Sequence, residues 1–316
     1  MKDLTNGPRQ EKNYFNKLTR ISPVANFAIL AFLCVVAVLV IVPIVLVVVI
    51  SFSSEYSIGK IGYSFFPTEW SLEAYEYLIF GDLGTQIFQS YGLTAAQAIL
   101  GTVLSLLVMS LYGYVLAQRN FAGKKFYTLL IFITMLFGGG LVPSYIVNTQ
   151  ILDLYDSFWV FILPGLISGY SVIILRTFIN STVPDEMLEA AKIDGANHFI
   201  IYSKIVMPLS KAGLAVVALW SIVGKWNDWF TATLYIENPK LVPLQTMLTR
   251  IQANIDFIKN NSALAASPEG AQILSSIPSD STRMAIVIIS ILPIMFAYPF
   301  FQRYFVQGIT VGSVKG

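Results

Sequence analysis

Long runs of apolar residues without any charged side chain dominate the chain. Such runs cover residues 21–54, 85–118, 126–152, 157–175 and 284–302, and a sixth, 212–236, is interrupted only by Lys225, Asn227 and Asp228. A helix crosses a bilayer with about 20 apolar residues and satisfies its own backbone groups there. We therefore predict an all-α membrane protein with six transmembrane helices, at 25–50, 86–117, 126–148, 157–178, 212–236 and 284–302.

Prolines lie inside three of the predicted spans, at Pro43, Pro164 and Pro293. Because proline lacks a backbone donor and its ring crowds the preceding turn, each is expected to kink its helix. The first apolar run is longer than the hydrophobic region of a secretory signal peptide, about 7–15 residues. We therefore expect it to be a retained transmembrane helix.

The basic residues predict the orientation of the chain in the membrane. With the N-terminus inside, 14 of the 20 Lys and Arg residues fall in cytoplasmic segments and five in external ones, the remaining one being Lys225. Positively charged loops stay on the cytoplasmic side, so both termini are predicted to be cytoplasmic. The resulting segments are an N-terminal segment 1–24, a membrane domain 25–302 and a C-terminal tail 303–316, with a cytoplasmic loop 179–211 and external loops 51–84 and 237–283.

Composition supports this assignment and excludes several classes of protein. Apolar residues make up 55% of the chain and charged residues only 12%, against about 25% charged residues in a typical soluble domain. The net charge of +2 does not suit a nucleic-acid-binding protein. One cysteine, Cys34, and one histidine, His198, provide neither a disulfide framework nor a metal or catalytic cluster. We therefore expect no catalytic, metal-binding or cofactor-binding residue.

The loop 179–211 has the signals of two short helices joined by a turn. Thr182 and Asp185 have the spacing of a capping box, and Pro184 between them suits a first helical turn. Gly195 lies where the first helix should end with a positive φ. These signals predict a helix over 183–194, then a turn, and then a helical segment over 197–207 that ends at Pro208. A loop lying in solvent or on lipid headgroups is the alternative interpretation.

One spacing pattern in this loop resembles a known family. Glu189-Ala190-Ala191, then Gly195, Ile205 and Pro208, is similar to the E-A-A-x3-G-x9-I-x-L-P loop of binding-protein-dependent ABC importer permeases, with Met207 in place of the leucine. The segments 65–75, 226–230 and 302–316 resemble segments of carbohydrate-type permeases. The chain is thus similar to maltose-type permease subunits, in the branch that imports complex saccharides.

The resemblance implies a type I ABC importer permease fold and a set of partners. A second, homologous permease subunit would complete the membrane unit, two ATP-binding subunits would bind ATP-Mg, and an extracytoplasmic solute-binding protein would deliver a saccharide. The helix 183–194 would be the coupling helix that receives motion from an ATPase subunit. In this interpretation Glu189 pairs with a polar group of the ATPase, Ala190 and Ala191 pack against it, and Gly195 makes the turn.

Ile205 and Pro208 would then anchor the loop to the fifth span. The chain cannot itself be the ATPase, because a P-loop requires Gly-Lys followed by Ser or Thr. The three Gly-Lys pairs of this chain are followed instead by Ile61, Lys125 and Trp226.

A polar interruption of the fifth span is the candidate substrate pathway. Lys225 and Asp228 lie three residues apart, on one face of a helix, and are expected to pair. Charged groups in a span are costly, which favours a function for them. With Trp226, Asn227 and Trp229 they offer the hydrogen-bonding and stacking groups that a saccharide needs. The alternative is an interfacial aromatic belt or a contact between helices.

Two other functions fit a polytopic membrane protein. An ion-coupled secondary transporter of a polar solute would have inverted repeats and several buried acids, of which only Asp228 is present. A membrane enzyme would have clustered acids or histidines at one membrane face. The pattern favours a permease of the cytoplasmic membrane of a prokaryote, contacting lipid but no nucleic acid, and without its own enzyme activity.

Overall fold

A computed structural model describes residues 22–81, 84–261 and 279–312, and all regular elements of these residues are helices. The only strand-like contact in this part of the chain is an isolated bridge between Ser53 and Trp70. Residues 1–21, 82–83, 262–278 and 313–316 lie outside the described residues. The structure therefore does not describe three parts of the predicted segments: most of the N-terminal segment 1–24, the middle of the 237–283 loop and the last residues of the 303–316 tail.

Three long helices coincide with three of the predicted spans. They are α2 (Pro23–Ser51), α5 (Gly84–Ala117) and α17 (Ser279–Gly312), which the predictions placed at 25–50, 86–117 and 284–302. Pro43 lies inside α2 and Pro293 inside α17. Helix α17 continues ten residues past the predicted end of the span, so most of the predicted tail 303–316 is helical.

The other three predicted spans are not continuous helices. The 126–148 span is divided into α6 (Lys124–Leu136), α7 (Leu141–Ile146) and one π-helical turn, η1 (Val147–Ile151). The intervening Gly138–Gly140 explains the break, because glycine disfavours a helix by about 1 kcal/mol per residue. Elements on the two sides of this break are bent by 116°.

The 157–178 span contains a 3₁₀ turn, η2 (Phe158–Phe161), and then α8 (Gly169–Thr182). Pro164 lies in the irregular segment between them, so it separates two elements instead of kinking one helix. The 212–236 span is divided into α12 (Lys211–Trp226) and α13 (Phe230–Tyr235). Three helices of the described residues are thus long and apolar enough to cross a membrane, or five if each of two bent helix pairs counts as one span.

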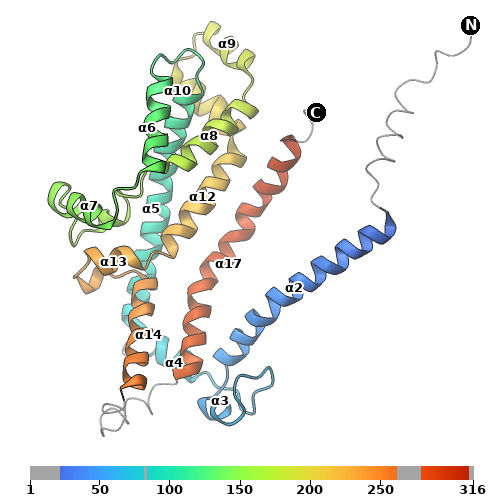
Figure 1. Ribbon diagram of the computed structural model, residues 1–316, viewed down its shortest axis with the longest axis vertical. Coiled ribbons are helices and arrows are strands. Elements are labelled where there is room, and N and C mark those ends of the chain that lie inside the picture. The colour runs from blue at the N-terminus through green and yellow to red at the C-terminus, as the bar shows by residue number, and fades with distance from the viewer. Residues whose placement is uncertain (1–21, 82–83, 262–278, 313–316) are drawn as a thin grey trace, which may run out of the picture.

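Helix α5 is the centre of the bundle and packs along both α8 and α12 (Figure 1). Helix α17 packs against α12 and α2. Most of α2 stands away from the bundle (Figure 1). Only 6% of the residues in its most apolar 18-residue stretch are buried. The arrangement leaves α5, α8 and α12 as the frame that positions both candidate functional regions.

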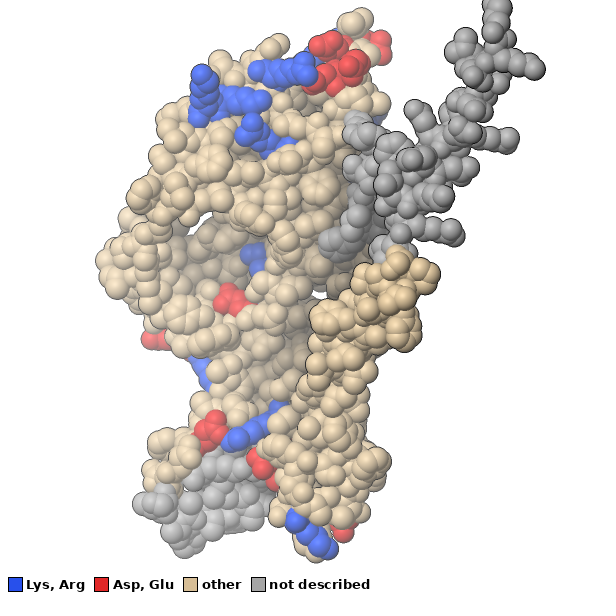
Figure 2. Space-filling view, turned by 45° about the vertical axis from the view of Figure 1, so that its right-hand side comes forward, with Lys and Arg blue, Asp and Glu red and all other residues tan. Residues whose placement is uncertain are grey.

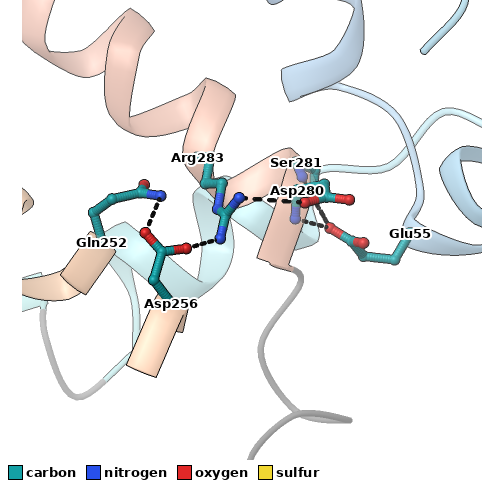
Figure 3. Close-up of polar contacts among 6 residues, drawn as sticks. All are labelled: Glu55, Gln252, Asp256, Asp280, Ser281 and Arg283. Carbon is teal, nitrogen blue, oxygen red and sulfur yellow. Dashed lines mark hydrogen bonds and ion pairs between the residues drawn. The ribbon is translucent and has the colours of Figure 1, made fainter. Parts of the chain in front are cut away.

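The predicted external loops contain short helices that join at one end of the bundle. They are α3 (Glu55–Ile61), α4 (Glu73–Ile79), η4 (Pro239–Leu241) and α14 (Leu244–Asn260). Glu55 accepts hydrogen bonds from the backbone N–H groups of Asp280 and Ser281, at 2.7 and 2.8 Å, and Arg283 forms an ion pair with Asp256 of α14 (Figure 3). These contacts tie α3 and α14 to the start of α17.

Candidate functional site: a protruding loop and a central cavity

The predicted pair of helices in the 179–211 loop is confirmed. Helix α9 covers Asp185–Ile193, and Gly195 follows it with φ +81°, the left-handed conformation that glycine adopts without strain. Asn197 then caps α10 (His198–Ile201), accepting a 2.9 Å hydrogen bond from the Ile200 N–H. A π-helical turn, η3 (Tyr202–Val206), and α11 (Met207–Leu209) complete the second helical segment.

The predicted capping box at the start of α9 is wrong. Thr182 is the last residue of α8, and its hydroxyl donates to the Phe178 carbonyl at 2.7 Å. Pro184 is the cap residue of α9 and provides no side-chain hydrogen bond. Asp185 instead forms an ion pair with Arg119, which follows the end of α5. The first turn of α9 is therefore attached to α5 and not to its own cap.

Helix α9 has one face packed on the protein and one face in solvent. Leu188 and Ala191 pack against a core cluster that includes Tyr114 of α5. Glu189 and Ala190 are exposed, and Ile193 is 86% exposed. The structure thus separates the two alanines of the motif, since Ala191 belongs to the inner face and only Ala190 to the outer one.

The second helical segment places the other two residues of the motif. Ile205 is half-buried and packs against the same core cluster as Ala191. Pro208 is exposed and lies in α11, two residues after the end of the π-helical turn η3 at Val206. The wider π-helical turn therefore stands next to a proline, which has no backbone donor for the helix.

Three side-chain contacts connect the loop to the end of α5. Ser110 and Tyr202 hydroxyls share a 2.6 Å hydrogen bond, and the Tyr114 hydroxyl lies 3.0 Å from Nδ1 of His198. The third contact is the ion pair between Arg119 and Asp185. A polar groove of about 590 Å³ lies between the end of α5 and α9, where Figure 2 shows acidic and basic side chains gathered. The loop and α5 are therefore one mechanical unit.

A second cavity, of about 670 Å³, opens in the middle of the molecule, where Figure 2 shows a hollow. Its wall is built from α5, from the broken segments around α7 and η2, and from α8, α12 and α13. Polar and aromatic side chains dominate the wall and include Ser105, Asn148, Ser168, Tyr170, Ser171, Trp220, Ser221, Lys225, Asp228, Thr231 and Tyr235.

The structure divides the five predicted pathway residues. Lys225 and Asp228 line the cavity, whereas Asn227 and Trp229 are exposed outside it. Trp226 is buried in the core, where its indole N–H donates to the Ser290 carbonyl of α17 at 3.0 Å. Trp226 therefore makes a contact between α12 and α17, the kind of contact that the alternative interpretation describes.

Lys225 and Asp228 do not form the expected ion pair. Helix α12 ends at Trp226, so the i, i+3 geometry that would join the two charges is lost. The Lys225 ammonium donates to the Phe161 carbonyl at 3.2 Å. The Asp228 carboxylate caps α13, accepting a 3.0 Å hydrogen bond from the Thr231 N–H.

Gly101 of α5 makes room for the Lys225 side chain. A Cβ atom at this position would lie 2.6 Å from Cε of Lys225, which is closer than any real contact. The Gln97 side chain, one turn earlier on α5, donates to the Lys225 carbonyl at 2.9 Å. Helix α5 therefore holds both the backbone and the side chain of Lys225 at the cavity wall.

The aromatic part of the cavity was not predicted from the sequence. Tyr170 of α8 and Trp220 of α12 stack with ring centroids 5.7 Å apart and an angle of 23° between the rings. Both line the cavity, as does Ser105, which is 1% exposed and whose hydroxyl has no hydrogen-bond partner among the described residues. Trp220 and Lys225 lie five residues apart, which is not the three- or four-residue spacing of one helix face, and Tyr170 lies too far away in sequence to be linked to them.

Comparisons with known proteins agree with this arrangement. The family described as "Binding-protein-dependent transport system inner membrane component" matches residues 111–311. The polygalacturonan/rhamnogalacturonan transport system permease protein YtcP of Bacillus subtilis (strain 168) is 33% identical, over 84% of this chain and 89% of its own length. Protein LplC of the same organism is 34% identical, over 84% of this chain and 86% of its own length.

A solved structure shares the fold. The crystal structure of a bacterial ABC transporter involved in the import of the acidic polysaccharide alginate contains a chain that matches with a TM-score of 0.77 and 26% identity. The match covers 91% of this chain and 98% of that chain.

Proposed function

Because this chain belongs to the family of inner-membrane components of binding-protein-dependent transport systems, we propose that it is the permease subunit of an ATP-driven importer of oligosaccharides or polysaccharide fragments. The family is that of the membrane component and not of the catalytic subunit. YtcP is by name a permease of polygalacturonan and rhamnogalacturonan, and the solved relative is a transporter of alginate. Both names support a saccharide as the solute of this chain.

The loop around α9 receives the movement of an ATPase subunit. The observation that carries this proposal is the division of α9 into two faces, with Glu189, Ala190 and Ile193 exposed and Leu188 and Ala191 held against α5. An exposed apolar side chain such as Ile193 suits a groove on a partner protein. Ile205 and Pro208 link the loop to α12, so a displacement of α9 reaches both α5 and α12.

The central cavity is one wall of the translocation pathway. It is open to the outside of the molecule, as expected if a second, homologous permease subunit supplies the opposite wall. Stacked aromatic rings and hydroxyl groups suit the flat apolar faces and the polar edges of sugars. An extracytoplasmic binding protein delivers the saccharide, and ATP-Mg is bound by two ATP-binding subunits and not by this chain.

We further propose that the chain crosses the membrane six times, with both termini in the cytoplasm. The broken segments α6–α7, η2–α8 and α12–α13 then serve as three of the crossings. Irregular backbone at membrane depth is tolerated where it lines a cavity, and the breaks at 162–168 and 227–229 border the central cavity. The loop 179–211 is cytoplasmic, and the segments 51–84 and 237–283 are external.

Reconstitution tests this function. The complex that co-purifies with a tag on this chain is placed in proteoliposomes with the binding protein outside and ATP inside. We expect saccharide uptake that requires ATP and stops when the ATP-binding subunits are removed. Uptake by the purified chain alone, driven by an ion gradient, would instead establish an ion-coupled secondary transporter.

A further inference from the structure

We propose that helix α17 bends at Pro293 while the saccharide passes, and that Tyr91 of α5 and Trp226 of α12 hold this hinge in the observed position. The inference rests on the proposed function and adds to it the part of the chain that moves. Helices bend most sharply at prolines, where a helical hydrogen bond is missing. Four features around Pro293 favour a movable hinge over a proline that only shapes the packing.

The first feature is a backbone carbonyl of α17 that has no partner within the helix. Proline has no N–H, so the carbonyl four residues before Pro293, that of Ile289, receives no helical hydrogen bond. Tyr91 of α5 supplies the missing donor, because its hydroxyl donates to the Ile289 carbonyl. A neighbouring helix that satisfies the freed group in this way makes a proline tolerable in a membrane helix. A bend at this position therefore has one helical hydrogen bond fewer to break.

The second feature is a donor from α12 to the next carbonyl. The indole N–H of Trp226 donates to the Ser290 carbonyl at 3.0 Å, and the centroids of the Tyr91 and Trp226 rings lie 5.9 Å apart. Trp226 ends α12, one residue after Lys225 of the central cavity. Helix α12 begins where the loop 179–211 ends, so this helix connects the loop to the hinge. Both bonds join α17 to another helix, and a relative movement of the helices can release them.

The third feature is a change in the packing of α17 at the proline. Before it, Thr282, Ala285 and Ile289 are buried. Glu55 and Arg283 also tie the start of the helix to α3 and α14 (Figure 3). The large side chains that follow the proline are at least half exposed, namely Met295, Phe296, Tyr298 and Phe300. The first part of α17 is therefore fixed to the bundle, and a bend at the proline would displace the second part.

The fourth feature is a small cavity beside the proline. Its volume is about 140 Å³, and its apolar wall is built from α5, α12 and α17. Ala98, Trp226, Pro293 and Ala297 are among the residues that line it. Protein interiors are otherwise closely packed, so side chains shift only where such space exists. The indole and the proline that meet at the hinge therefore have room to move.

The first measurement follows the second part of α17. Spin labels are attached to Lys211→Cys of α12 and Gln302→Cys of α17, two exposed positions remote from the hinge, in a chain with Cys34→Ser. Exposed Gln89→Cys of α5 and Val287→Cys of α17 form a control pair on the other side of the proline. We expect ATP, saccharide and binding protein to change the distance in the first pair, in the complete complex in proteoliposomes, and to leave the control pair unchanged.

The second measurement tests the bond between Tyr91 and Ile289. Tyr91→Phe removes only the hydroxyl, and without ATP we expect it to raise the ratio of moved to unmoved complexes about two- to tenfold, the size of one neutral hydrogen bond. Pro293→Ala returns an N–H to the Ile289 carbonyl, so Tyr91→Phe should have no further effect in that background. Tyr112→Phe is the matched control, because its hydroxyl belongs to the same helix and binds the Tyr127 carbonyl instead of α17.

Trp226→Phe removes the second donor and keeps an aromatic ring, and we expect a rise of the same sign. Equal distance changes in both label pairs would overturn the hinge, as would an equal effect of Tyr91→Phe with and without Pro293→Ala. The first measurement keeps Tyr91, Trp226 and Pro293, so it decides the question even where a hinge variant does not assemble. Saccharide uptake with an unmoved first pair would overturn the hinge alone, whereas no uptake by the unaltered complex would refute the proposed function.

Discussion

The protruding loop and the central cavity are built in opposite ways. The loop is a single continuous segment, 179–211, whose helices and turn follow from residues within a few positions of one another. The cavity is assembled from four separate segments of the chain, 105–109, 141–148, 160–171 and 220–235, and its stacked pair joins Tyr170 to Trp220, fifty residues apart. A surface that contacts another protein can be encoded locally, whereas a surface that surrounds a solute depends on tertiary packing.

The two regions also use α5 differently. At the loop, α5 contributes Ser110 and Tyr114, which bind the segment that follows α9. At the cavity, α5 leaves space instead of making a bond, because Gly101 has no side chain that would collide with Lys225. Substitutions in the two regions should therefore affect attachment of the ATPase and passage of the saccharide separately.

The largest effect is expected for Gly195→Val. Valine at φ +81° is strained by about 1–3 kcal/mol, so the turn after α9 would rearrange and the exposed face would lose its orientation. We expect saccharide uptake to be abolished and less ATP-binding subunit to co-purify, measured by transport and by pull-down. Gly59→Val is the control, since Gly59 has an ordinary φ and no atom within 4 Å of an added Cβ. Normal uptake in Gly195→Val would contradict a coupling role.

Gly101→Val should affect the cavity and spare the loop. An added Cβ would displace the Lys225 side chain from its groove, and we expect uptake to fall about tenfold, comparable to the loss of a charged hydrogen bond. The ATP-binding subunits should still co-purify. Gly92→Val on the same helix is the matched control, because its Cβ would meet nothing within 4 Å. Loss of the ATP-binding subunits in Gly101→Val would show that the two regions are not separable.

Trp220→Ala should lower saccharide uptake about two- to tenfold, because an aromatic contact contributes about 0.5–1.5 kcal/mol. Trp229→Ala is a matched comparison, since both indoles are 47% exposed but only Trp220 lines the cavity. The concentration of saccharide that gives half-maximal uptake is the measurement. A larger effect at Trp229 would favour the pathway expected from the sequence over the cavity of the structure.

The smallest effect is expected for Arg119→Ala. The guanidinium is 75% exposed, and exposed ion pairs contribute about 0.2–1 kcal/mol. We expect uptake to fall less than about threefold. Asp185→Asn and the double variant complete a cycle that isolates the pair, and an uptake loss as large as that of Gly195→Val would mean that the ion pair, and not the turn, orients α9.

Local signals explain which parts of the structure were predictable. Three uninterrupted apolar runs gave α2, α5 and α17, and Gly195 gave the turn after α9. Two of the other spans also contain residues that indicate a break, namely Gly138–Gly140 and the polar residues after Trp226. A prediction that only counts apolar residues takes no account of such helix-breaking residues. The orientation of the Trp226 side chain could not be predicted from nearby residues, because the Ser290 carbonyl that it binds belongs to a helix 64 residues away in sequence.

The isolation of α2 has a consequence for how the protein is made. Among the described residues, this helix is held by its packing along α17 and, at its last residue, by the hydrogen bond between Ser51 and Tyr75 of α4. Most of its length has no other neighbour, so we expect it to enter the bilayer as soon as it leaves the ribosome. The short helices α8 and α12 lack that independence, because both pack along α5. We therefore expect α2 to insert first and the short helices to pack on α5 later. A nascent chain arrested after α5 should already resist extraction from the membrane by alkali.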